Sequence, residues 1–456
     1  MLGKQVNLRY DGDEMDRIER YADIMNQAYA SFLRQPDHPG ILQLCGPEGM
    51  GKTTLARHCA NTGNGGMYFS FHHLDAALAP RIFMSGCPDW ESFFAKIRAA
   101  KKRPIIFFDD VDARNDKEVF FKSLCSCLDG KLFVVFICRK EMTLPCPYRV
   151  LEMKAVTVPE LCEMRKGLTK VDALRLTALT NGIPRLLSQY QASKSYEENL
   201  RMFFTPGSLF LRYAPDFLRD EFRSPESYNT LLYGMAVGYN RISQLAEFSG
   251  YPKNKCDKYL KALAAVGLTE QRQKKDEAGQ LRTHYYPQGG YWKVWYRCYF
   301  PHQTQFVKPL SDEVLQDLIA QIDRSAVIPL FRKLCFQWLR EHALTICWDE
   351  ELQLKNPAQY DVSVNGCHFD FVQFAKDWNF YVKIWDSTEE GFPKSVFRQI
   401  ETATTALRPF YENIYVLFSV RRVCHYIEAL RELENVRIVE LNSLFGKKNM
   451  EIFEEI

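Results

Sequence analysis

The residues best suited to chemistry lie in one stretch of the chain, GPEGMGKTT, which fits the phosphate-binding pattern G-x-x-x-x-G-K-[ST] at every required position. Its glycines allow backbone N–H groups to turn inward around phosphate oxygens, and the positive end of a following helix adds to the attraction. The candidate nucleotide-binding residues are Gly46, Pro47, Glu48, Gly49, Met50, Gly51, Lys52, Thr53 and Thr54. This stretch predicts a P-loop that binds ATP.

Two side chains of this loop have separate expected roles. Lys52 would reach the β- and γ-phosphates, and the Thr53 hydroxyl would join the shell of a bound Mg²⁺. An apolar run at 41–45 precedes the loop and a helix-compatible segment at 54–60 follows it, which is the required order of strand, loop and helix. The alternative is a glycine-rich surface turn that matches by chance, and the length and setting of the motif argue against it.

A second acidic motif follows another apolar run, at 105–108. A buried parallel strand there would deliver Asp109 to the sheet edge beside the P-loop, where its carboxylate holds Mg²⁺ through the water shell. Asp110 occupies the place where many ATPases carry a glutamate that orients the attacking water. Its side chain is one methylene shorter, so we expect hydrolysis that is slow or that needs reorganisation of the site when a partner binds. Taken alone, the segment also fits a buried strand that runs into an acidic turn.

The apolar run 132–138 predicts a further strand, and it ends at Arg139. In P-loop ATPases of the AAA+ and STAND group, the corresponding strand ends in a polar sensor residue near the γ-phosphate, and Arg139 matches that position. A guanidinium there would stabilise phosphate charge. The alternative is an arginine that extends from a strand end into solvent.

Composition limits the class of protein. A chain of 456 residues is too long for one core, and its 25% charged and 46% hydrophobic residues are those of a soluble globular protein. The sequence contains no run of eighteen apolar residues, and residues 1–7 turn polar too soon for a signal peptide, so we expect a cytoplasmic protein without membrane contact. The net charge of +3 means that nucleic-acid binding would need a local basic patch.

The middle of the chain predicts helices over 156–204, beginning with a cap at Thr157, and then a helix-turn-helix followed by a hairpin over 226–286. These elements indicate a winged helix. Its candidate phosphate-contacting cations are Lys253, Lys255, Lys258, Lys261, Arg272, Lys274, Lys275 and Arg282. Duplex DNA binding and a role only in domain packing or oligomer formation remain equally open, because nearby acidic residues dilute the patch.

The chain resembles the archaeal-type ATPase family of the STAND/AAA+ assemblage through the P-loop, Asp109-Asp110, the NGIPR segment 181–185 and the segment 296–301. The resemblance implies an ATPase domain, a helical lid, a winged helix and a C-terminal domain of PD-(D/E)XK nuclease type. It also implies that Gly182 and Pro184 lie near the adenine and ribose. The sequence departs from the family pattern at Asp13-Glu14, Asp110 and Cys138-Arg139.

The C-terminal part alternates helices and strands, which predicts a second α/β unit. Asp370 matches the first aspartate of the nuclease-type motif, but the next strand reads YVKIWD and lacks the Glu-x-Lys. One aligned carboxylate is too few to hold a hard divalent ion. We therefore expect a docking surface for protein or nucleic acid and no nuclease activity.

The sequence thus predicts an α/β protein with a P-loop ATPase domain at 1–155, a helical lid at 156–220, a winged helix at 221–310 and a degenerate nuclease-like domain at 311–456. The expected function is an ATP-driven, Mg²⁺-dependent conformational switch. The alternative is a nucleic-acid-binding regulator or defence component in which ATP is mainly structural. The sequence is compatible with an oligomer.

Overall fold

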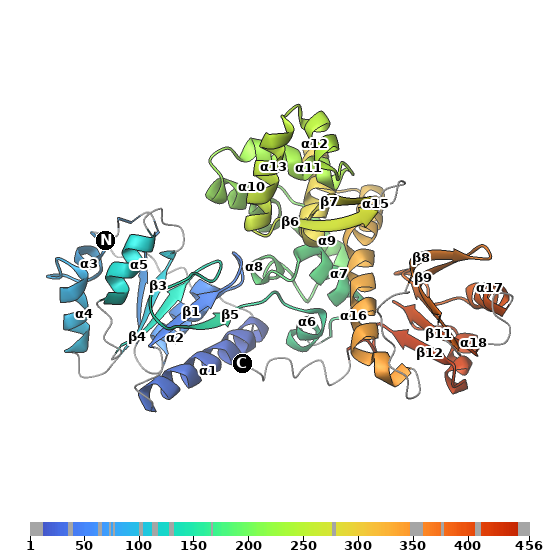
Figure 1. The fold of residues 1–456 in the computed structure, drawn as a ribbon, viewed down its shortest axis with the longest axis horizontal. Helices are drawn as coiled ribbons and strands as arrows, with labels where there is room; N and C mark the ends of the chain where they lie inside the picture. Colours follow the sequence, from blue (N-terminus) through green and yellow to red (C-terminus); the bar gives the residue numbers. More distant parts are fainter. Residues whose placement is uncertain are drawn as a thin grey trace. The chain divides into compact units, whose positions relative to one another are not determined.

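The chain divides into two compact units, and Figure 1 shows the helices and strands that build them. Unit 1 comprises Met1–Val156 with Ile183–Ser188, and unit 2 comprises Thr157–Gly182 with Gln189–Ile456. The computed structural model describes residues 12–34, 40–62, 66–72, 74–75, 78–99, 104–111, 117–126, 132–165, 167–275, 280–346, 359–374, 378–405 and 412–445.

Unit 1 is built on a five-stranded parallel sheet with the strand order β2-β3-β4-β1-β5. The strands are β1 (Ile41–Cys45), β2 (Met67–Ser70), β3 (Ile105–Asp109), β4 (Phe133–Ile137) and β5 (Arg149–Glu152). Strand β4 lies between β1 and β3, so the loops that follow these three strands meet at one edge of the sheet. The sheet confirms the expected α/β fold, and β5 is a strand that we did not predict.

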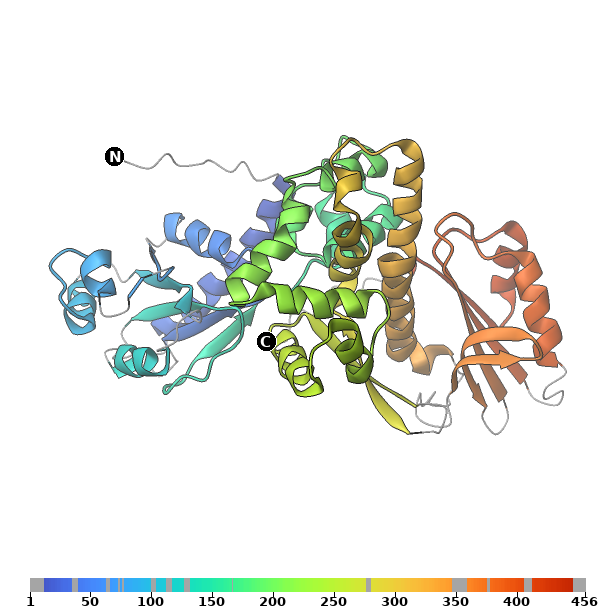
Figure 2. The same cartoon turned by 90° about the horizontal axis from the view of Figure 1, so that it is seen from above.

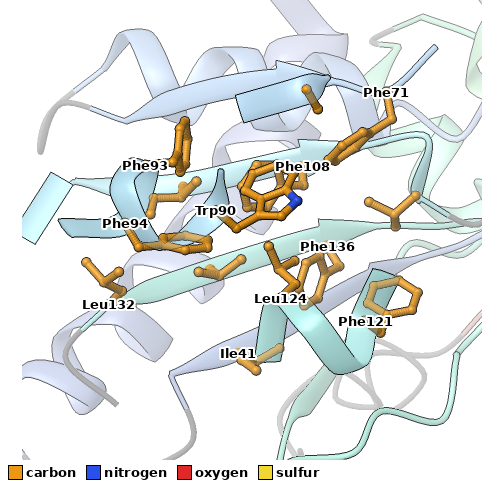
Figure 3. Close-up of a cluster of buried hydrophobic side chains, with 14 of the residues drawn as sticks. Ile41, Phe71, Trp90, Phe93, Phe94, Phe108, Phe121, Leu124, Leu132 and Phe136 are labelled. Atoms are coloured by element: carbon orange, nitrogen blue, oxygen red, sulfur yellow. The ribbon is translucent and has the colours of Figure 1, made fainter. Parts of the chain in front are cut away.

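Helices cover both faces of this sheet. They are α1 (Gly12–Arg34), α2 (Lys52–Asn61), α3 (Ala79–Phe83), α4 (Trp90–Arg98) and α5 (Lys117–Ser126). On one face, Trp90, Phe93 and Phe94 of α4 pack with Phe108 of β3 and Phe136 of β4 in an aromatic core (Figure 3). The predicted cap of α4 is present, because the Asp89 carboxylate accepts a hydrogen bond from the Ser92 N–H at 2.8 Å.

The opposite face of the sheet receives α1. Successive side chains of a strand point to opposite faces, so Phe133 points away from the face that Phe136 joins. Tyr29 and Phe32 of α1 pack on the Phe133 ring, each with ring centroids 5.5 Å apart. Burial of such aromatic side chains contributes about 1.5–3 kcal/mol each, and it holds α1 against the strand that ends beside the P-loop.

Unit 2 begins with helices as predicted. They are α6 (Val158–Met164), α7 (Lys170–Thr180), α9 (Tyr196–Phe203) and α10 (Leu209–Glu221), while the short α8 (Pro184–Leu187) belongs to unit 1. The start of α6 is fixed by a capping box in which Thr157 and Glu160 exchange hydrogen bonds. Helix α7 ends at Asn181, whose backbone is left-handed with φ of 54°.

Three helices and a hairpin follow, namely α11 (Pro225–Ala236), α12 (Ile242–Ser249), α13 (Lys253–Ala265), β6 (Thr269–Lys275) and β7 (Leu281–Pro287). β6 and β7 pair antiparallel, with Arg272 opposite His284 and Lys274 opposite Arg282. The chain then forms α14 (Gly289–Val294), η2 (Trp295–Tyr299), η3 (Phe300–Phe306), α15 (Asp312–Ile322), η4 (Asp323–Val327) and α16 (Ile328–Ile346). Gly290 of α14 lies so close to α7 that a Cβ there would be 2.1 Å from the Ala178 carbonyl oxygen.

A separate five-stranded sheet forms the C-terminal part, with the order β12-β11-β10-β9-β8. Its elements are β8 (Gln359–Val364), β9 (Cys367–Phe374), β10 (Trp378–Trp385), α17 (Lys394–Thr405), β11 (Glu412–Ser419), α18 (His425–Ala429), η5 (Leu430–Glu432) and β12 (Val436–Glu440). β8, β9 and β10 are antiparallel, whereas β10, β11 and β12 are parallel.

Helices lie on both sides of this second sheet (Figure 2). Trp338 of α16 contacts Phe418, and Phe397 of α17 contacts Tyr415, whose side chain points to the opposite face of β11. Within the ranges given above, the chain contains no helix that is both long and apolar enough to cross a membrane.

Candidate nucleotide-binding site

The predicted P-loop connects β1 to α2. Gly46, Gly49 and Gly51 all adopt positive φ values, of 147°, 82° and 93°. A side chain at Gly46 would place its Cβ 2.5 Å from the Met153 carbonyl oxygen, so only glycine fits where the loop leaves β1. Gly51 is the N-cap of α2, and the helix therefore starts at Lys52 with its positive end toward the loop. Pro47, Glu48 and Met50 complete the loop, and Thr54 lies in the first turn of α2.

Lys52 folds back over its own loop. Its ammonium group donates to the carbonyl oxygens of Gly46 at 2.5 Å and Pro47 at 2.8 Å. Both acceptors are uncharged, and a phosphate oxygen is a stronger acceptor for an ammonium ion. The lysine is thus held beside the loop by contacts that a phosphate can replace.

Asp109 is the centre of a hydrogen-bonded group at the end of β3. It is buried, with 4% of its surface exposed. Its Oδ2 accepts from the Thr53 hydroxyl and from the Tyr68 hydroxyl, each at 2.7 Å, and its Oδ1 accepts from the Asp110 N–H at 2.9 Å. Burial first, and then the charge of Asp109, raise the pKa of Tyr68, so this hydroxyl stays protonated and acts as a donor. Tyr68 was not a predicted site residue.

The residues at this edge fit a bound Mg²⁺. Mg²⁺ prefers hard oxygen ligands and keeps several waters. The Thr53 hydroxyl and the Asp109 carboxylate meet at 2.7 Å, so a metal held by the Thr53 oxygen would have a buried carboxylate next to its water shell. These are the two residues that the sequence predicted for the metal.

Asp110 follows in an unusual backbone conformation. Its φ of 60° is left-handed, and it is one of few residues other than glycine in that region. The Ser70 hydroxyl of β2 donates to Asp110 Oδ2 at 2.9 Å. Parallel pairing places Ser70 directly opposite Asp109, so the Ser70 side chain lies within reach of Asp110, the residue that follows Asp109. The carboxylate predicted to orient water is therefore held by the neighbouring strand.

Arg139 lies in the loop that follows β4, between the loops that follow β1 and β3. A buried glutamine of β1 fixes this loop. Gln43 donates to the Met142 carbonyl oxygen at 2.6 Å and accepts from the Met142 N–H at 2.9 Å. The topology thus brings Arg139 to the same sheet edge as Lys52 and Asp109. Gln43, which holds this loop, is a residue that sequence reasoning missed.

Arg17 of α1 is a third residue near the P-loop that we did not predict. It is 3% exposed, and its guanidinium donates to the carbonyl oxygens of Met50, at 3.3 Å, and Lys154. Its position within the segment DRIE, between apolar residues at helical spacing, was the available signal. Arg17 ties α1 to the P-loop and to the segment after β5.

The NGIPR segment divides between the two units. Within unit 2, Asn181 accepts from the Tyr291 N–H at 2.9 Å, and Gly182 has a φ of 65°. Within unit 1, Pro184 starts α8, the Arg185 N–H donates to the Gly49 carbonyl oxygen at 3.1 Å, and the Arg185 guanidinium pairs with Glu48 at 2.6 Å. Arg185, which sequence reasoning did not single out, is therefore the residue of this segment that binds the P-loop.

The carboxylate predicted in the C-terminal sheet is already paired. Asp370 is 2% exposed, its Oδ2 accepts from the Ile384 N–H at 2.5 Å, and its Oδ1 is bound by the Arg332 guanidinium. Arg332 also lies 3.3 Å from Asp386 and 3.5 Å from Asp361. The part of the chain that the structure describes has no cluster of three or more His, Cys, Asp or Glu side chains suited to a metal ion.

Residues 42–139 match the family model described as ATPase family associated with various cellular activities (AAA). The chain therefore contains an AAA ATPase domain, and the matched region runs from β1 to Arg139. A comparison with curated proteins finds no match.

Solved structures show loose similarity to the chain. The Orc1 protein of Aeropyrum pernix in complex with DNA is 13% identical, with a TM-score of 0.35 over 67% of this chain and 92% of that one. Cdc6p from Pyrobaculum aerophilum is 15% identical, with a TM-score of 0.30 over 70% and 96%. A STAND protein with a tetratricopeptide repeat sensor from Pyrococcus horikoshii is 15% identical, with a TM-score of 0.27 over 72% and 47%. At these TM-scores the similarities assign no function to the chain.

Proposed function

We propose that the chain is a conformational switch that binds and slowly hydrolyses ATP and transmits the nucleotide state of the P-loop through α8. The contact of Arg185 with the P-loop carries this proposal. Arg185 binds Gly49 and Glu48 within unit 1, whereas the chain on both sides of Ile183–Ser188 belongs to unit 2. A bound phosphate that changes the conformation of the P-loop would therefore move α8. The chain continues from both ends of this segment into unit 2, so the movement would be passed on to unit 2.

Each residue of the site has a defined task in this proposal. Lys52 exchanges its two carbonyl acceptors for the β- and γ-phosphates, and Arg139 stabilises charge on the γ-phosphate. Thr53, and Asp109 through water, would hold a bound Mg²⁺, which would neutralise part of the phosphate charge. Asp110 orients the attacking water and accepts its proton.

The lid residues Gly182 and Pro184 complete the proposed site near the adenine and ribose. Pro184 begins the short helix that carries Arg185, and the left-handed Gly182 directly precedes this segment. A change of φ and ψ at Gly182 costs little because glycine lacks a Cβ. We propose this position as the joint at which unit 2 responds to the nucleotide.

Substitution of Lys52 and Asp109 tests the proposal. We expect Lys52→Ala to weaken ATP binding by about 100-fold, because the variant removes charge-assisted hydrogen bonds to phosphate. Asp109→Asn should retain nucleotide but lose Mg²⁺-dependent turnover. Equilibrium binding of a fluorescent ATP analogue and a phosphate-release assay measure the two effects. Wild-type binding and turnover in both variants would contradict the site.

A second candidate function is a nucleic-acid-binding regulator in which ATP is mainly structural, and the hairpin β6–β7 favours it. We propose that α11, α12, α13 and this hairpin form a winged helix. Cross-strand pairing puts Arg272, Lys274, Arg282 and His284 on one face of the hairpin, because opposite residues and alternate residues share a face. Nearby Lys274 and Arg241 contribute, after burial, to a lowered pKa of His284, which marks a locally positive surface.

DNA binding through the proposed winged helix would be mainly electrostatic. Arg272 of β6 and Lys261 of α13 are already paired with Glu270 and Asp257, so we assign the contacts to Lys255 and Lys258 of α13 and to Lys274 of β6. Replacing these three lysines by Glu should weaken binding of unrelated duplexes alike and flatten the dependence of log K on log salt. Stimulation of turnover by DNA supports the switch, whereas tight ATP retention without turnover supports the regulator.

We further propose that α16 and the elements from β8 to β12 form the degenerate nuclease-like domain and serve as a docking surface. The support is the order of one helix, three antiparallel strands and two further parallel strands, together with the pairing of Asp370 by Arg332. The Arg332 guanidinium balances the negative charge of Asp370, which a metal ion would balance in an active site of this type.

A further inference from the structure

Tyr68 contacts the proposed metal-binding carboxylate from the neighbouring strand. It lies on β2 opposite Phe107 of β3, and alternation along both strands puts its side chain on the same face of the sheet as Asp109. The Tyr68 hydroxyl donates to Asp109 Oδ2 at 2.7 Å. The Arg57 guanidinium of α2 lies 5.0 Å from the centre of the Tyr68 ring and covers it. Strand pairing and α2 therefore hold the tyrosine in place.

The acceptor positions of Asp109 are almost filled by the protein itself. A carboxylate offers about four lone-pair positions, two on each oxygen. Oδ2 accepts from both Thr53 and Tyr68, and Oδ1 accepts from the Asp110 N–H. About one position, on Oδ1, remains for a water molecule of a bound metal ion.

The Thr53 hydrogen bond is compatible with a bound metal, but the Tyr68 bond competes with one. The Thr53 oxygen keeps a lone pair for the metal while its proton stays on Asp109. The Tyr68 hydroxyl occupies a lone pair of Asp109 Oδ2 that a metal-bound water would otherwise use. Its positive hydrogen also offsets part of the negative potential of the carboxylate that attracts the cation.

We propose that Tyr68 is a positioning residue that restrains Mg²⁺ loading by holding one acceptor position of Asp109. The acceptor position left on Oδ1 can take one metal-bound water, and a second such hydrogen bond to Asp109 would require exchange of the tyrosine hydrogen bond. The inference rests on the proposed nucleotide function, and it adds a residue of β2 that controls how readily the site accepts the metal.

Tyr68→Phe tests this proposal, because it removes the hydroxyl and keeps the ring under Arg57. The binding of N-methylanthraniloyl-ATP to the full chain is followed by fluorescence while Mg²⁺ is varied. We expect the half-saturating Mg²⁺ concentration to fall about three- to tenfold. This is the effect expected when part of the free energy of a hydrogen bond to a charged group no longer opposes metal binding. Nucleotide affinity without Mg²⁺ should stay as in the wild type. Tyr68→Leu, which also lacks the hydroxyl, should shift the midpoint in the same direction.

Two controls separate this effect from a general structural one. Tyr148→Phe removes a similar bond within unit 1, from a tyrosine hydroxyl to Glu141 Oε1 at 3.0 Å, and it should leave the Mg²⁺ midpoint unchanged. In an Asp109→Asn background, Tyr68→Phe should no longer shift the midpoint, because the charged acceptor is gone.

The outcomes distinguish the inference from the proposed function. If the wild-type chain binds the nucleotide with Mg²⁺ but Tyr68→Phe needs the same or more Mg²⁺, the restraint is wrong and the nucleotide site stands. If the wild-type chain shows no Mg²⁺-dependent nucleotide binding, the proposed function is wrong and this inference fails with it.

Discussion

At the scale of single residues, Asp110 combines a left-handed backbone with a carboxylate that accepts a hydrogen bond from the Ser70 hydroxyl. A left-handed conformation in a residue other than glycine costs of order 1–3 kcal/mol and persists where surrounding contacts enforce it. Aspartate tolerates this conformation better than glutamate, since its short side chain bonds locally. An Asp110→Glu variant would therefore combine longer reach with added strain, and a change at Ser70 tests the carboxylate without touching its backbone.

We predict that Ser70→Ala raises the rate of ATP turnover about three- to tenfold. The variant removes the hydrogen bond from the Ser70 hydroxyl to Asp110 Oδ2, so this oxygen regains an acceptor position for the attacking water. Steady-state phosphate release measures the rate, and the affinity for ATP should not change. Ser70→Thr keeps a hydroxyl and should behave like the wild type. A lower rate in Ser70→Ala would show that the serine holds Asp110 in its working position.

At the scale of elements, the C-terminal sheet is joined to α16 by an ion pair between Arg332 and Asp370. Asp370 of β9 is buried and depends on Arg332 of α16 and on the Ile384 N–H of β10. Removal of one partner of a buried ion pair leaves an unbalanced charge and costs about 3–5 kcal/mol. Neutralising the second partner should recover part of that loss.

We predict that Arg332→Ala destabilises the C-terminal sheet by about 3–5 kcal/mol and that adding Asp370→Asn restores part of it. An asparagine oxygen can still accept from the Ile384 N–H. Urea unfolding followed by tryptophan fluorescence measures both variants. Equal stability of Arg332→Ala and the wild type would show that solvent screens the pair.

The same pairing predicts that the chain does not cut nucleic acid by a two-carboxylate metal mechanism. Single- and double-stranded DNA and RNA, incubated with Mg²⁺ or Mn²⁺ and with or without ATP, should remain intact on a denaturing gel. Lys383, on the strand after Asp370, donates to the His368 carbonyl oxygen at 2.6 Å and would repel a cation. Cleavage that disappears in Asp370→Ala would show that the site is active.

At the scale of the whole molecule, three distant parts of unit 2 meet at Asp323. This carboxylate is 7% exposed and accepts from Arg175 of α7 at 3.0 and 3.3 Å. It also accepts from the Thr388 hydroxyl, which follows β10, at 2.8 Å. The helices that begin unit 2 and its C-terminal sheet are thus joined through one buried charge.

We predict that Asp323→Ala lowers the stability of unit 2 by about 3–5 kcal/mol, because Arg175 remains buried without its partner. Hydrogen–deuterium exchange should then rise both near Arg175 and near Thr388. Asp312→Ala is the matched control, since it breaks another Arg–Asp pair of unit 2 whose carboxylate is exposed. Faster exchange near Arg175 alone would show that the two segments are independent.

Local signals predicted the elements that carry the proposed site. The P-loop, the apolar strand before Asp109 and the cap at Thr157 depend on residues within a few positions, and the structure contains each of them. Strand β8 was missed although its signal was present. Asn365-Gly366 forms the turn between β8 and β9 with positive φ at both residues, which is the preference of a two-residue hairpin.

The remaining site residues depend on contacts that no local pattern encodes. Arg185 binds a residue 137 positions earlier, Tyr68 a residue 41 positions later, and Arg332 a residue 38 positions later. Each is an ordinary surface or strand residue in its own neighbourhood of the sequence. Only the order of strands and the path of the chain bring these partners together.

The path of the chain through α8 has a consequence for synthesis on the ribosome. Domains generally fold as units while the chain emerges from its N-terminus. The five strands of unit 1 emerge first, and α6 and α7 of unit 2 emerge before α8 returns to unit 1. The P-loop of the nascent chain therefore lacks its hydrogen bond and ion pair with Arg185 until α6 and α7 of unit 2 have been synthesised. Unit 1 is therefore complete only after the first helices of unit 2 have been synthesised, and we expect the two units to fold in overlapping steps.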